Sequence, residues 1–411
     1  MNRLLEDLKI STRVEEGPLV QYIGSYIAQL LSDGYAKHSI YLKIRLVGAF
    51  SRWLSLKGIA TKSLTDQHSI DFLRYYNRHS RRHGLGDAAT LRRLFKLLRD
   101  QGVIPQPATA QTTPSERLVE EYDVYLQRER VLSLATRINY RPFVQKFLTV
   151  KFGKGPVALS RLCATDIIEF VRCHAGQLHG KRVQLMTTAL RSFLRFARRR
   201  GDINLDLAAC VPAVASWSLS LLPRALPPAQ VKLVLRHCNQ QTGIVRRDYA
   251  ILLLLARLGL RSGEVARLNL EDIDWRNGFF SVLGKGGHSS QLPLPADIGK
   301  AIAAYLKNGR PRLSGSRRVF LRAKAPAVGF TSMAVRDVVK RAFARAGIDS
   351  PRKGAHQFRH ALATSMLNRG ASLSEIGELL RHQSPDTTRI YAKVDLVSLR
   401  ALAMPWPGGE R

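Results

Sequence analysis

Apolar side chains recur every three or four residues through most of the first 200 positions. The pattern is clear in L-V-Q-Y-I-G-S-Y-I-A-Q-L-L, in H-S-I-Y-L-K-I-R-L-V-G-A-F and in A-T-L-R-R-L-F-K-L-L-R-D-Q-G. This spacing puts the apolar residues on one face of an amphipathic helix, and Gly102 stands where the last of these helices should stop. Because strand patterns are scarce, residues 18–104 are predicted to form a small helical domain.

The next segment repeats the first at an offset of roughly 98 residues, the scale at which internal duplication is sought. The strongest match aligns residues 91–104 with residues 190–203, where Arg, Gly and Ile positions agree as well as the apolar ones. An alternative is two unrelated amphipathic bundles with the same apolar period. The other matched positions are Leu19-Val20 with Leu118-Val119, Tyr26 with Tyr125, Phe50 with Phe147, Leu64 with Leu162, Ile70 with Ile168, and Phe72 with Phe170.

Two proline-rich breaks divide the chain. The stretch P-Q-P-A-T-A-Q-T-T-P at 105–114 suits an extended linker, and four prolines fall between 211 and 228. Three domains are therefore predicted: an additional helical domain at 1–105, a second helical domain at 115–210, and a larger domain at 223–411.

The third domain combines helical and strand patterns. The apolar run Ala250–Ala256 predicts a buried helix that Gly259 ends, and F-F-S-V-L and Q-L-P-L-P flank a Gly-rich turn at 284–287, as in a β-hairpin. Helices are expected again at 295–308 and 331–346. The predicted fold class is mainly α, with two small helical domains followed by a mostly helical domain that carries a short antiparallel sheet.

The net charge of the chain limits the kinds of partner that it is expected to bind. The formal net charge is +34, divided as +8 for 1–105, +8 for 106–222 and +18 for 223–411. Such a field favours a polyanionic partner, either nucleic acid or an anionic membrane. A membrane span needs about 20 apolar residues, whereas Arg257 interrupts the longest run. The first ten residues mix both signs of charge, unlike a secretory signal, so a cytoplasmic, nucleoid-associated protein is expected.

The cysteines do not indicate a metal site. They are widely scattered and lack the close Cys and His ligands of structural zinc, so reduced, mostly buried thiols are predicted and neither a metal nor a cofactor is expected. The four residues are Cys163, Cys173, Cys210 and Cys238.

Candidate chemistry lies in three separated segments. H-Q-F-R-H places His356 and Arg359 on one helix face. Further along the sequence, the segment L-L-R-H-Q-S-P-D-T-T-R-I-Y contains His382 and ends at Tyr391. Upstream, G-L-R-S-G-E contains Arg261 and Glu264. Two guanidiniums are suited to stabilise the charge that grows on a phosphodiester under attack, and a tyrosine hydroxyl can be the nucleophile. Glu264 is interpreted as structural, holding its segment by charge-assisted hydrogen bonds.

With these segments assembled, residues 115–400 resemble the tyrosine recombinase, or phage integrase, family. The resemblance implies a core-binding domain at 115–205 that clamps duplex DNA with the catalytic domain, cleavage through a 3′-phosphotyrosine, and a C-terminal tail that docks on a neighbouring protomer of a tetramer. It implies six catalytic residues: Arg261 and Arg359 on the phosphate, Lys285 as the general acid, His356 assisting proton transfer, His382 bonding the phosphate, and Tyr391 as the nucleophile.

Each role has a structural alternative, and two positions depart from the family. Arg261 could cap a helix, Lys285 could be a solvated turn charge, His382 could end a helix, and Tyr391 could be a core aromatic residue. On the hairpin, His288 and Gln291 stand where further basic residues are common in the family. Arg381 stands where the family commonly has glycine, and it would either contact the phosphate or lie on the surface.

The expected function is an integrase or transposase of a mobile element, with possible sister recombinases or accessory proteins. The additional N-terminal domain favours this role over an alternative in the same chemistry, the housekeeping resolution of chromosome or plasmid dimers. A non-catalytic DNA-binding regulator is the alternative from another class. A complete catalytic set argues against it, because a regulator has no use for the nucleophile.

Overall fold

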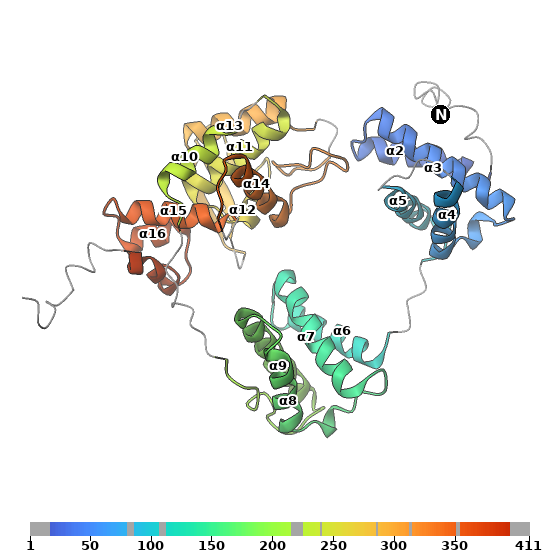
Figure 1. Ribbon diagram of the computed structural model, residues 1–411, viewed down its shortest axis with the longest axis horizontal. Helices are drawn as coiled ribbons and strands as arrows, with labels where there is room; N and C mark the ends of the chain where they lie inside the picture. Colours follow the sequence, from blue (N-terminus) through green and yellow to red (C-terminus); the bar gives the residue numbers. More distant parts are fainter. Residues whose placement is uncertain are drawn as a thin grey trace, which may run out of the picture. The chain divides into compact units, whose positions relative to one another are not determined.

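The computed structural model describes residues 17–79, 86–106, 112–214, 225–238, 241–284, 287–311, 315–350 and 354–394. The chain divides into two compact units, one formed by 108–220 and the other by 1–107 together with 221–411 (Figure 1). Within the second of these, residues 19–104 and residues 226–361 bury separate hydrophobic clusters. The predicted boundaries of three domains stay a prediction.

The first hundred residues and the following hundred contain the same series of helices. In residues 17–106 the order is α2 (Val20–Ser32), α3 (Lys37–Leu56), the 3-10 turn η2 (Thr61–Ser63), α4 (Asp66–His79) and α5 (Asp87–Asp100). In residues 112–214 it is α6 (Pro114–Arg128), α7 (Leu134–Phe152), η3 (Leu159–Arg161), α8 (Ala164–Ala175) and α9 (Gly180–Arg200). The helical prediction for both segments is confirmed, and the shared order supports duplication.

Matched positions also share their burial. Phe50 and Phe147 lie in equivalent places of the two cores, whereas Ile70 and Ile168 are exposed in both. Other matched core positions are Leu64 with Leu162 and Phe72 with Phe170.

The sequence pairing of one tyrosine was wrong. Tyr26 is buried and its hydroxyl donates to the Thr90 carbonyl at 3.0 Å. Its equivalent is the buried Tyr122, whose hydroxyl donates to the Ala189 carbonyl at 3.5 Å, and not Tyr125. Tyr26 therefore corresponds to the tyrosine 96 positions later and not to the one 99 positions later. The correspondence follows which side of the helix is buried, and a match of residue type alone does not reveal that side.

The C-terminal part is helical with one small sheet. Its helices are α10 (Pro228–Arg236), α11 (Gly243–Leu258), α12 (Ser262–Arg267), α13 (Ala296–Asn308), α14 (Ser332–Arg345), α15 (His356–Leu367) and α16 (Leu373–Leu380), followed by η4 (Pro385–Thr387) and η5 (Arg389–Val394). The strands are β1 (Ile273–Asp274), β2 (Phe279–Leu283) and β3 (Ser289–Pro293), antiparallel in that order.

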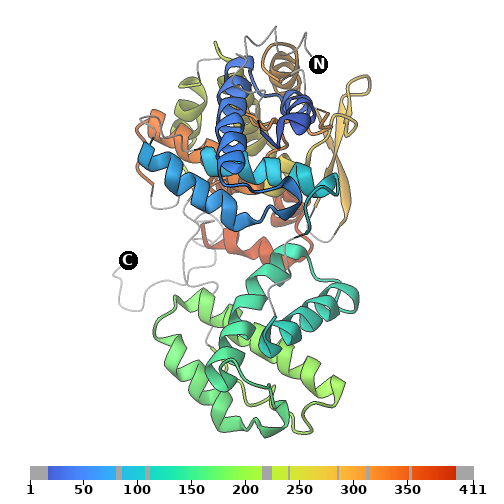
Figure 2. The same ribbon diagram turned by 90° about the vertical axis from the view of Figure 1, so that its right-hand side faces the viewer.

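The predicted hairpin is confirmed and carries one more strand than expected. Phe280 of β2 faces Leu292 of β3 on one side and Ile273 of β1 on the other. The hairpin strands are drawn in gold in Figure 2. The two residues of β1 are too few to show an alternating pattern, so this strand was not predicted.

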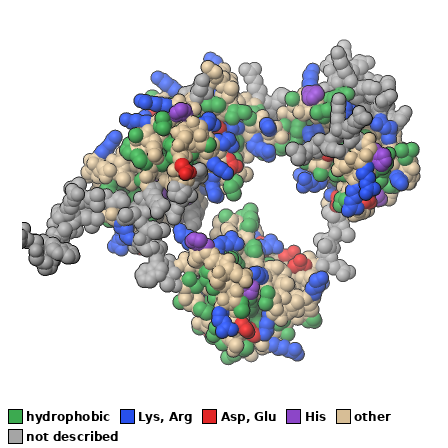
Figure 3. Space-filling view, in the orientation of Figure 1, with side chains coloured by type: hydrophobic (Ala, Val, Ile, Leu, Met, Phe, Trp, Pro, Cys, Tyr) green, Lys and Arg blue, Asp and Glu red, His purple; other side chains and the backbone are tan. Residues whose placement is uncertain are grey.

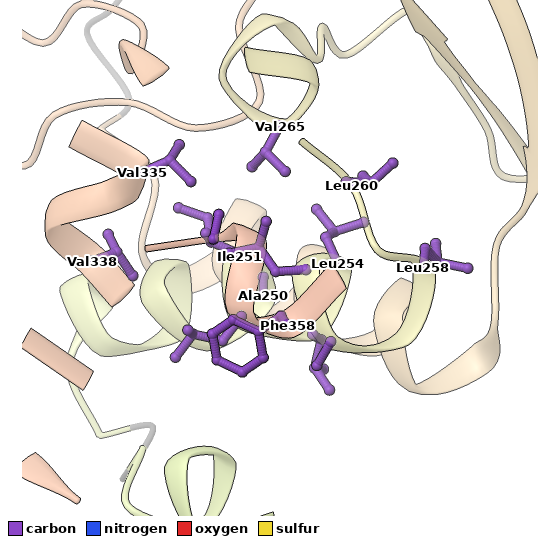
Figure 4. Close-up of a cluster of buried hydrophobic side chains, with 14 of the residues drawn as sticks. Ala250, Ile251, Leu254, Leu258, Leu260, Val265, Val335, Val338 and Phe358 are labelled. Carbon is purple, nitrogen blue, oxygen red and sulfur yellow. The ribbon is translucent and has the colours of Figure 1, made fainter. Parts of the chain in front are cut away.

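Helix α11 is the centre of the C-terminal core. Ala250, Ile251 and Leu254 of α11 are buried, and Val265 of α12 and Phe358 of α15 are buried in the same cluster (Figure 4). Each fully buried aliphatic side chain of this kind stabilises the fold by about 1.5–3 kcal/mol. This packing fixes the ends of α11, α12 and α15 relative to one another, and Arg261, His356 and Arg359 lie at those ends.

The cysteines are free, but most of them are not buried. All four cysteines are free, but Cys163 and Cys173 are exposed and only Cys238 is buried, so the prediction of mostly buried thiols was wrong. Scattered positions gave no information on burial. Among the described residues there is no cluster of His, Cys, Asp or Glu suited to a metal ion, and no described helix is long and apolar enough to cross a membrane.

Candidate active site

The segment between α11 and α12 positions the first arginine. Gly259 ends α11 with φ +56°, and Arg261 is the residue that precedes α12. The carboxylate of Glu264, which is buried, accepts from the Arg261 backbone N–H at 2.8 Å and from Arg261 Nη1 at 2.8 Å. These charge-assisted bonds hold the pKa of Glu264 below its usual value against the desolvation that would raise it. The structural interpretation of Glu264 is confirmed.

Arg359 joins three elements from inside the fold. It is 4% exposed, donates from Nη1 to the Gly259 carbonyl at 2.6 Å, and donates from Nη2 to the Leu380 carbonyl. These bonds connect α15 to the ends of α11 and α16. Burial, followed by the positive charges of Arg261 and Arg381, lowers the pKa of Arg359 to about 10. The guanidinium therefore stays charged at neutral pH.

Arg381 has a role that the sequence did not predict. Its backbone is left-handed, with φ +55°, which explains why glycine suits this position. The side chain is only 10% exposed, and Nη2 donates to Glu264 Oε2 at 3.1 Å. The expectation of a surface position was wrong, because this guanidinium turns inward to share the Glu264 carboxylate with Arg261. A phosphate contact by Arg381 stays a prediction.

Both predicted histidines lie near these guanidiniums. His356 is the first residue of α15 and keeps part of its side chain exposed, but partial desolvation, followed by the charges of Arg359 and Arg261, lowers its pKa. Desolvation, then Arg359, Arg261 and Arg381, lower the pKa of His382 to about 4. A hydrogen bond of 2.7 Å joins His382 Nδ1 to the hydroxyl of the buried Thr388. His382 is therefore neutral at pH 7 with its ring held in place.

Tyr391 lies almost fully buried beside a histidine that was not predicted. It is 2% exposed and packs with Ala363, Ile376 and Leu380. A hydrogen bond of 3.0 Å joins its hydroxyl to His360 Nδ1. Burial raises the pKa of the phenol, whereas the charges of Arg359 and Arg261 lower it.

The structure thus brings five of the six predicted residues together. The charge of Arg261 acts on His356, Arg359, His382 and Tyr391, although these residues are up to 130 positions away in the sequence. The sixth, Lys285, falls between β2 and β3 in the sequence and lies outside the described residues. On the same hairpin, His288 and Gln291 are exposed.

Sequence reasoning missed two contacts at the site. His360 is part of the H-Q-F-R-H segment, and its position four residues after His356 was the available signal. Thr388 lies between His382 and Tyr391 and gave no signal, because a threonine there resembles any residue of a polar loop.

This arrangement is suited to an anionic substrate. The charges of Arg359 and Arg261 act on the buried Tyr391 hydroxyl, and His360 is hydrogen-bonded to it. The carboxylate of Glu264 offsets part of the positive charge of the neighbouring arginines. A phosphodiester could accept hydrogen bonds from the guanidiniums while the hydroxyl attacks phosphorus.

Comparison with known families supports the same chemistry. Residues 224–396 match the phage integrase family, and residues 119–201 match its N-terminal SAM-like domain. The chain is 48% identical over 400 residues to the candidate integrase/recombinase y4rA of Sinorhizobium fredii, covering 97% of each chain. It is 29% identical to the tyrosine recombinase XerC of Lactobacillus delbrueckii, covering 69% of this chain and 96% of that protein.

Solved structures show a similar fold. A XerH site-specific recombinase bound to a palindromic difH substrate aligns with a TM-score of 0.56 at 20% identity, covering 82% of this chain and 94% of that one. A Tn1549 transposon integrase in complex with a circular intermediate DNA aligns with a TM-score of 0.51 at 18% identity, covering 69% and 98%.

Proposed function

The chain belongs to the phage integrase family of tyrosine recombinases, and from that premise we propose that it cuts and rejoins duplex DNA through a covalent 3′-phosphotyrosine at Tyr391. The observation that carries the proposal is the position of this hydroxyl, which is buried, lies 3.0 Å from His360 Nδ1, and is close enough to Arg359 and Arg261 for their charges to oppose the rise in its pKa that burial causes. A phosphate bound to these guanidiniums lies next to the attacking oxygen.

The proposed roles of the other residues follow from their surroundings. Arg261 and Arg359 bind the non-bridging oxygens, and their charges stabilise the transition state. Neutral His382 donates a hydrogen bond to the phosphate, and exposed His356 assists proton transfer. Lys285 protonates the departing 5′ oxygen. Because the phosphotyrosine retains the energy of the broken bond, rejoining needs neither ATP nor a metal.

Recombination between two DNA sites in the presence of a chelator tests this function. DNA that flanks the coding region supplies the substrate, and exchanged strands are expected with wild-type protein but not with Tyr391→Phe. Binding without exchange by the wild type would favour the alternative of a non-catalytic regulator.

We propose that the recombinase serves integration or transposition of a mobile element. In support of this role, the integrase/recombinase candidate y4rA aligns over 97% of this chain, whereas XerC of Lactobacillus delbrueckii covers 69% of it. A chain that only resolves dimers has no evident need for the additional repeat. Inverted repeats at both sides of the coding region would support the mobile element, and their absence together with resolution of plasmid dimers would support the housekeeping role.

The proposed domains are an additional DNA-binding domain at 1–105, a core-binding domain at 115–210 and a catalytic domain at 223–411. Helices α5 and α9 carry basic residues at equivalent positions four and seven apart, which lie along one side of a helix. Lys96 and Arg195 are exposed, and lysine and arginine are also spread over the visible faces in Figure 3. The equivalent pairs are Arg92 with Arg191, Lys96 with Arg195, and Arg99 with Arg198.

We further propose that four copies act on two paired duplexes, with sister recombinases or accessory proteins as additional partners. Exchange between two duplexes requires four strand cuts, and each chain supplies one Tyr391. The tail V-D-L-V-S-L-R-A-L-A-M at 394–404 is proposed to dock on a neighbouring protomer, with packing on its own domain as the alternative, and from residue 395 onward it lies outside the described residues. Light scattering of the protein–DNA complex, with and without this segment, measures the number of copies and tests the docking.

A further inference from the structure

The side chain of His360 is hydrogen-bonded to the Tyr391 hydroxyl. Its Nδ1 lies 3.0 Å from the phenolic oxygen, and the two rings meet edge to face with centroids 5.6 Å apart. Both residues are held in place: His360 lies in the second turn of α15, and Tyr391 is buried in η5. A hydrogen bond of this length between an imidazole and a phenol is suited to proton transfer.

The surroundings leave few other acceptors for the phenolic proton. Arg359 and Arg261 act on this hydroxyl, but guanidiniums are donors without acceptor capacity. His382 Nδ1 is bonded to Thr388, and its pKa of about 4 makes it a poor base. The hydrophobic side chains of α15 and α16 that pack on Tyr391 offer no acceptor. Among the described residues, His360 has a ring nitrogen in hydrogen-bond contact with the hydroxyl, and that nitrogen can carry a lone pair.

We propose that His360 is the general base that takes the proton from Tyr391 during DNA cleavage, an inference that rests on the proposed strand-transfer function. In the tautomer with hydrogen on Nε2, the tyrosine hydroxyl donates to Nδ1. As the phenolic oxygen bonds to phosphorus, its proton moves to Nδ1 and the bond from phosphorus to the 5′ oxygen breaks. A separate donor protonates that oxygen. Rejoining returns the proton from His360 to the tyrosine.

The test uses the full chain and a nicked duplex in which the 5′ fragment diffuses away after cleavage, so that one cleavage event is measured. His360→Asn keeps a polar side chain of similar length, but its amide cannot accept a proton as a neutral imidazole does. Its cleavage rate is expected to fall by about 10²–10⁴-fold, the usual contribution of a positioned base. His237→Asn, on an exposed histidine at the end of α10, is the matched control and should cleave at the wild-type rate.

A second change separates proton transfer from simple positioning. Replacing Tyr391 with 3,5-difluorotyrosine makes the phenol more acidic, so it needs less help from a base. The deficit of His360→Asn is then expected to shrink by at least about tenfold, because proton removal contributes less to the barrier. A misplaced tyrosine would keep the same deficit with either phenol. Binding to the intact site is measured in parallel, and His360→Gln replaces the asparagine variant if that variant does not fold.

The outcomes are distinct. A deficit in His360→Asn that fluorination reduces supports the base. Cleavage within about threefold of wild type, or a deficit that fluorination leaves unchanged, overturns it. If wild-type protein forms no adduct on its site, the proposed function itself fails.

Discussion

Arg381 shows how one residue can combine a strained backbone with a useful side chain. Its φ of +55° lies in the left-handed region, while its guanidinium shares buried Glu264 with Arg261. We expect Arg381→Gly to be more stable than Arg381→Ala by about 1 kcal/mol, because both lose the ion pair but only glycine removes the strain. Urea denaturation measures the difference, and equal stability of the two variants would contradict the account.

The lowered pKa of His382 makes stability depend on pH. Its pKa of about 4 in the folded chain lies below the ordinary value of 6.5, so the unfolded chain binds the proton more readily between these values. The contribution is complete above pH 6.5 and is lost as the pH falls toward 4. After allowance for solvent screening of a half-buried group, we expect a loss on the order of 1 kcal/mol.

His382→Asn isolates this contribution from that of other titrating groups. Denaturation curves at pH 4.5 and 6.5 should differ less for the variant than for wild type. A pH dependence that is the same in both proteins would show that His382 is not the source.

At the residue scale, the sequence was sufficient where spacing alone carried the information. Spacing placed Arg261 with Glu264 in one turn and His356 with Arg359 on one helix, and the structure shows the Arg261–Glu264 hydrogen bonds and the shared helix α15. The catalytic roles of these residues stay predictions. The contact of Arg381 with Glu264 spans 117 positions and that of His360 with Tyr391 spans 31. Such contacts depend on how helices pack, which local patterns do not contain.

At the element scale, the close approach at Gly259 joins α11 to α15 and α16. A Cβ at this position would lie 2.8 Å from Leu380 Cδ2 and 3.2 Å from Leu362 Cδ2, and φ is +56°. Since the Gly259 carbonyl also accepts from Arg359, a shift here would move a predicted catalytic group.

Gly259→Ala is therefore expected to cost about 2–3 kcal/mol, the sum of left-handed strain and local overpacking. Gly347→Ala is the matched control, because φ there is +64° but a Cβ would meet no atom within 4 Å. It should cost about 1 kcal/mol. Urea denaturation compares the two, and similar losses would show that the contact with Leu380 is unimportant.

The secondary structure was predicted best where the apolar pattern extended over many residues. The helices of both repeats, α11 and the β2–β3 hairpin were found, whereas the two-residue strand β1 was not. The repeat was recognised, but Tyr26 was paired with Tyr125 because the comparison matched residue types at a nearly constant offset. Tyr122 is the tyrosine that, like Tyr26, lies on the buried face of its helix.

At the scale of the whole molecule, the net charge of +34 and the repeated basic helices predict DNA binding that weakens steeply with salt. If α5 contacts DNA, the double variant Arg92→Ala/Lys96→Ala loses two phosphate contacts. The slope of log K against log salt should then decrease in magnitude by about 1.8, at roughly 0.9 per contact.

Fluorescence anisotropy with duplex DNA over a range of salt concentrations measures this slope. Lys57→Ala together with Lys62→Ala, two exposed lysines outside α5, is the charge-matched control. An equal change in both double variants would assign the effect to net charge and not to the α5 face.

The most direct test of the central claim is to identify the residue that becomes attached to DNA. Wild-type protein is incubated with a nicked duplex from the flanking DNA, denatured and digested, and the nucleotide-linked peptide is identified by mass spectrometry. The account predicts one peptide, in which the 3′ phosphate is joined to Tyr391, and none from Tyr391→Phe. An adduct on another residue, or one that persists in Tyr391→Phe, would contradict the account.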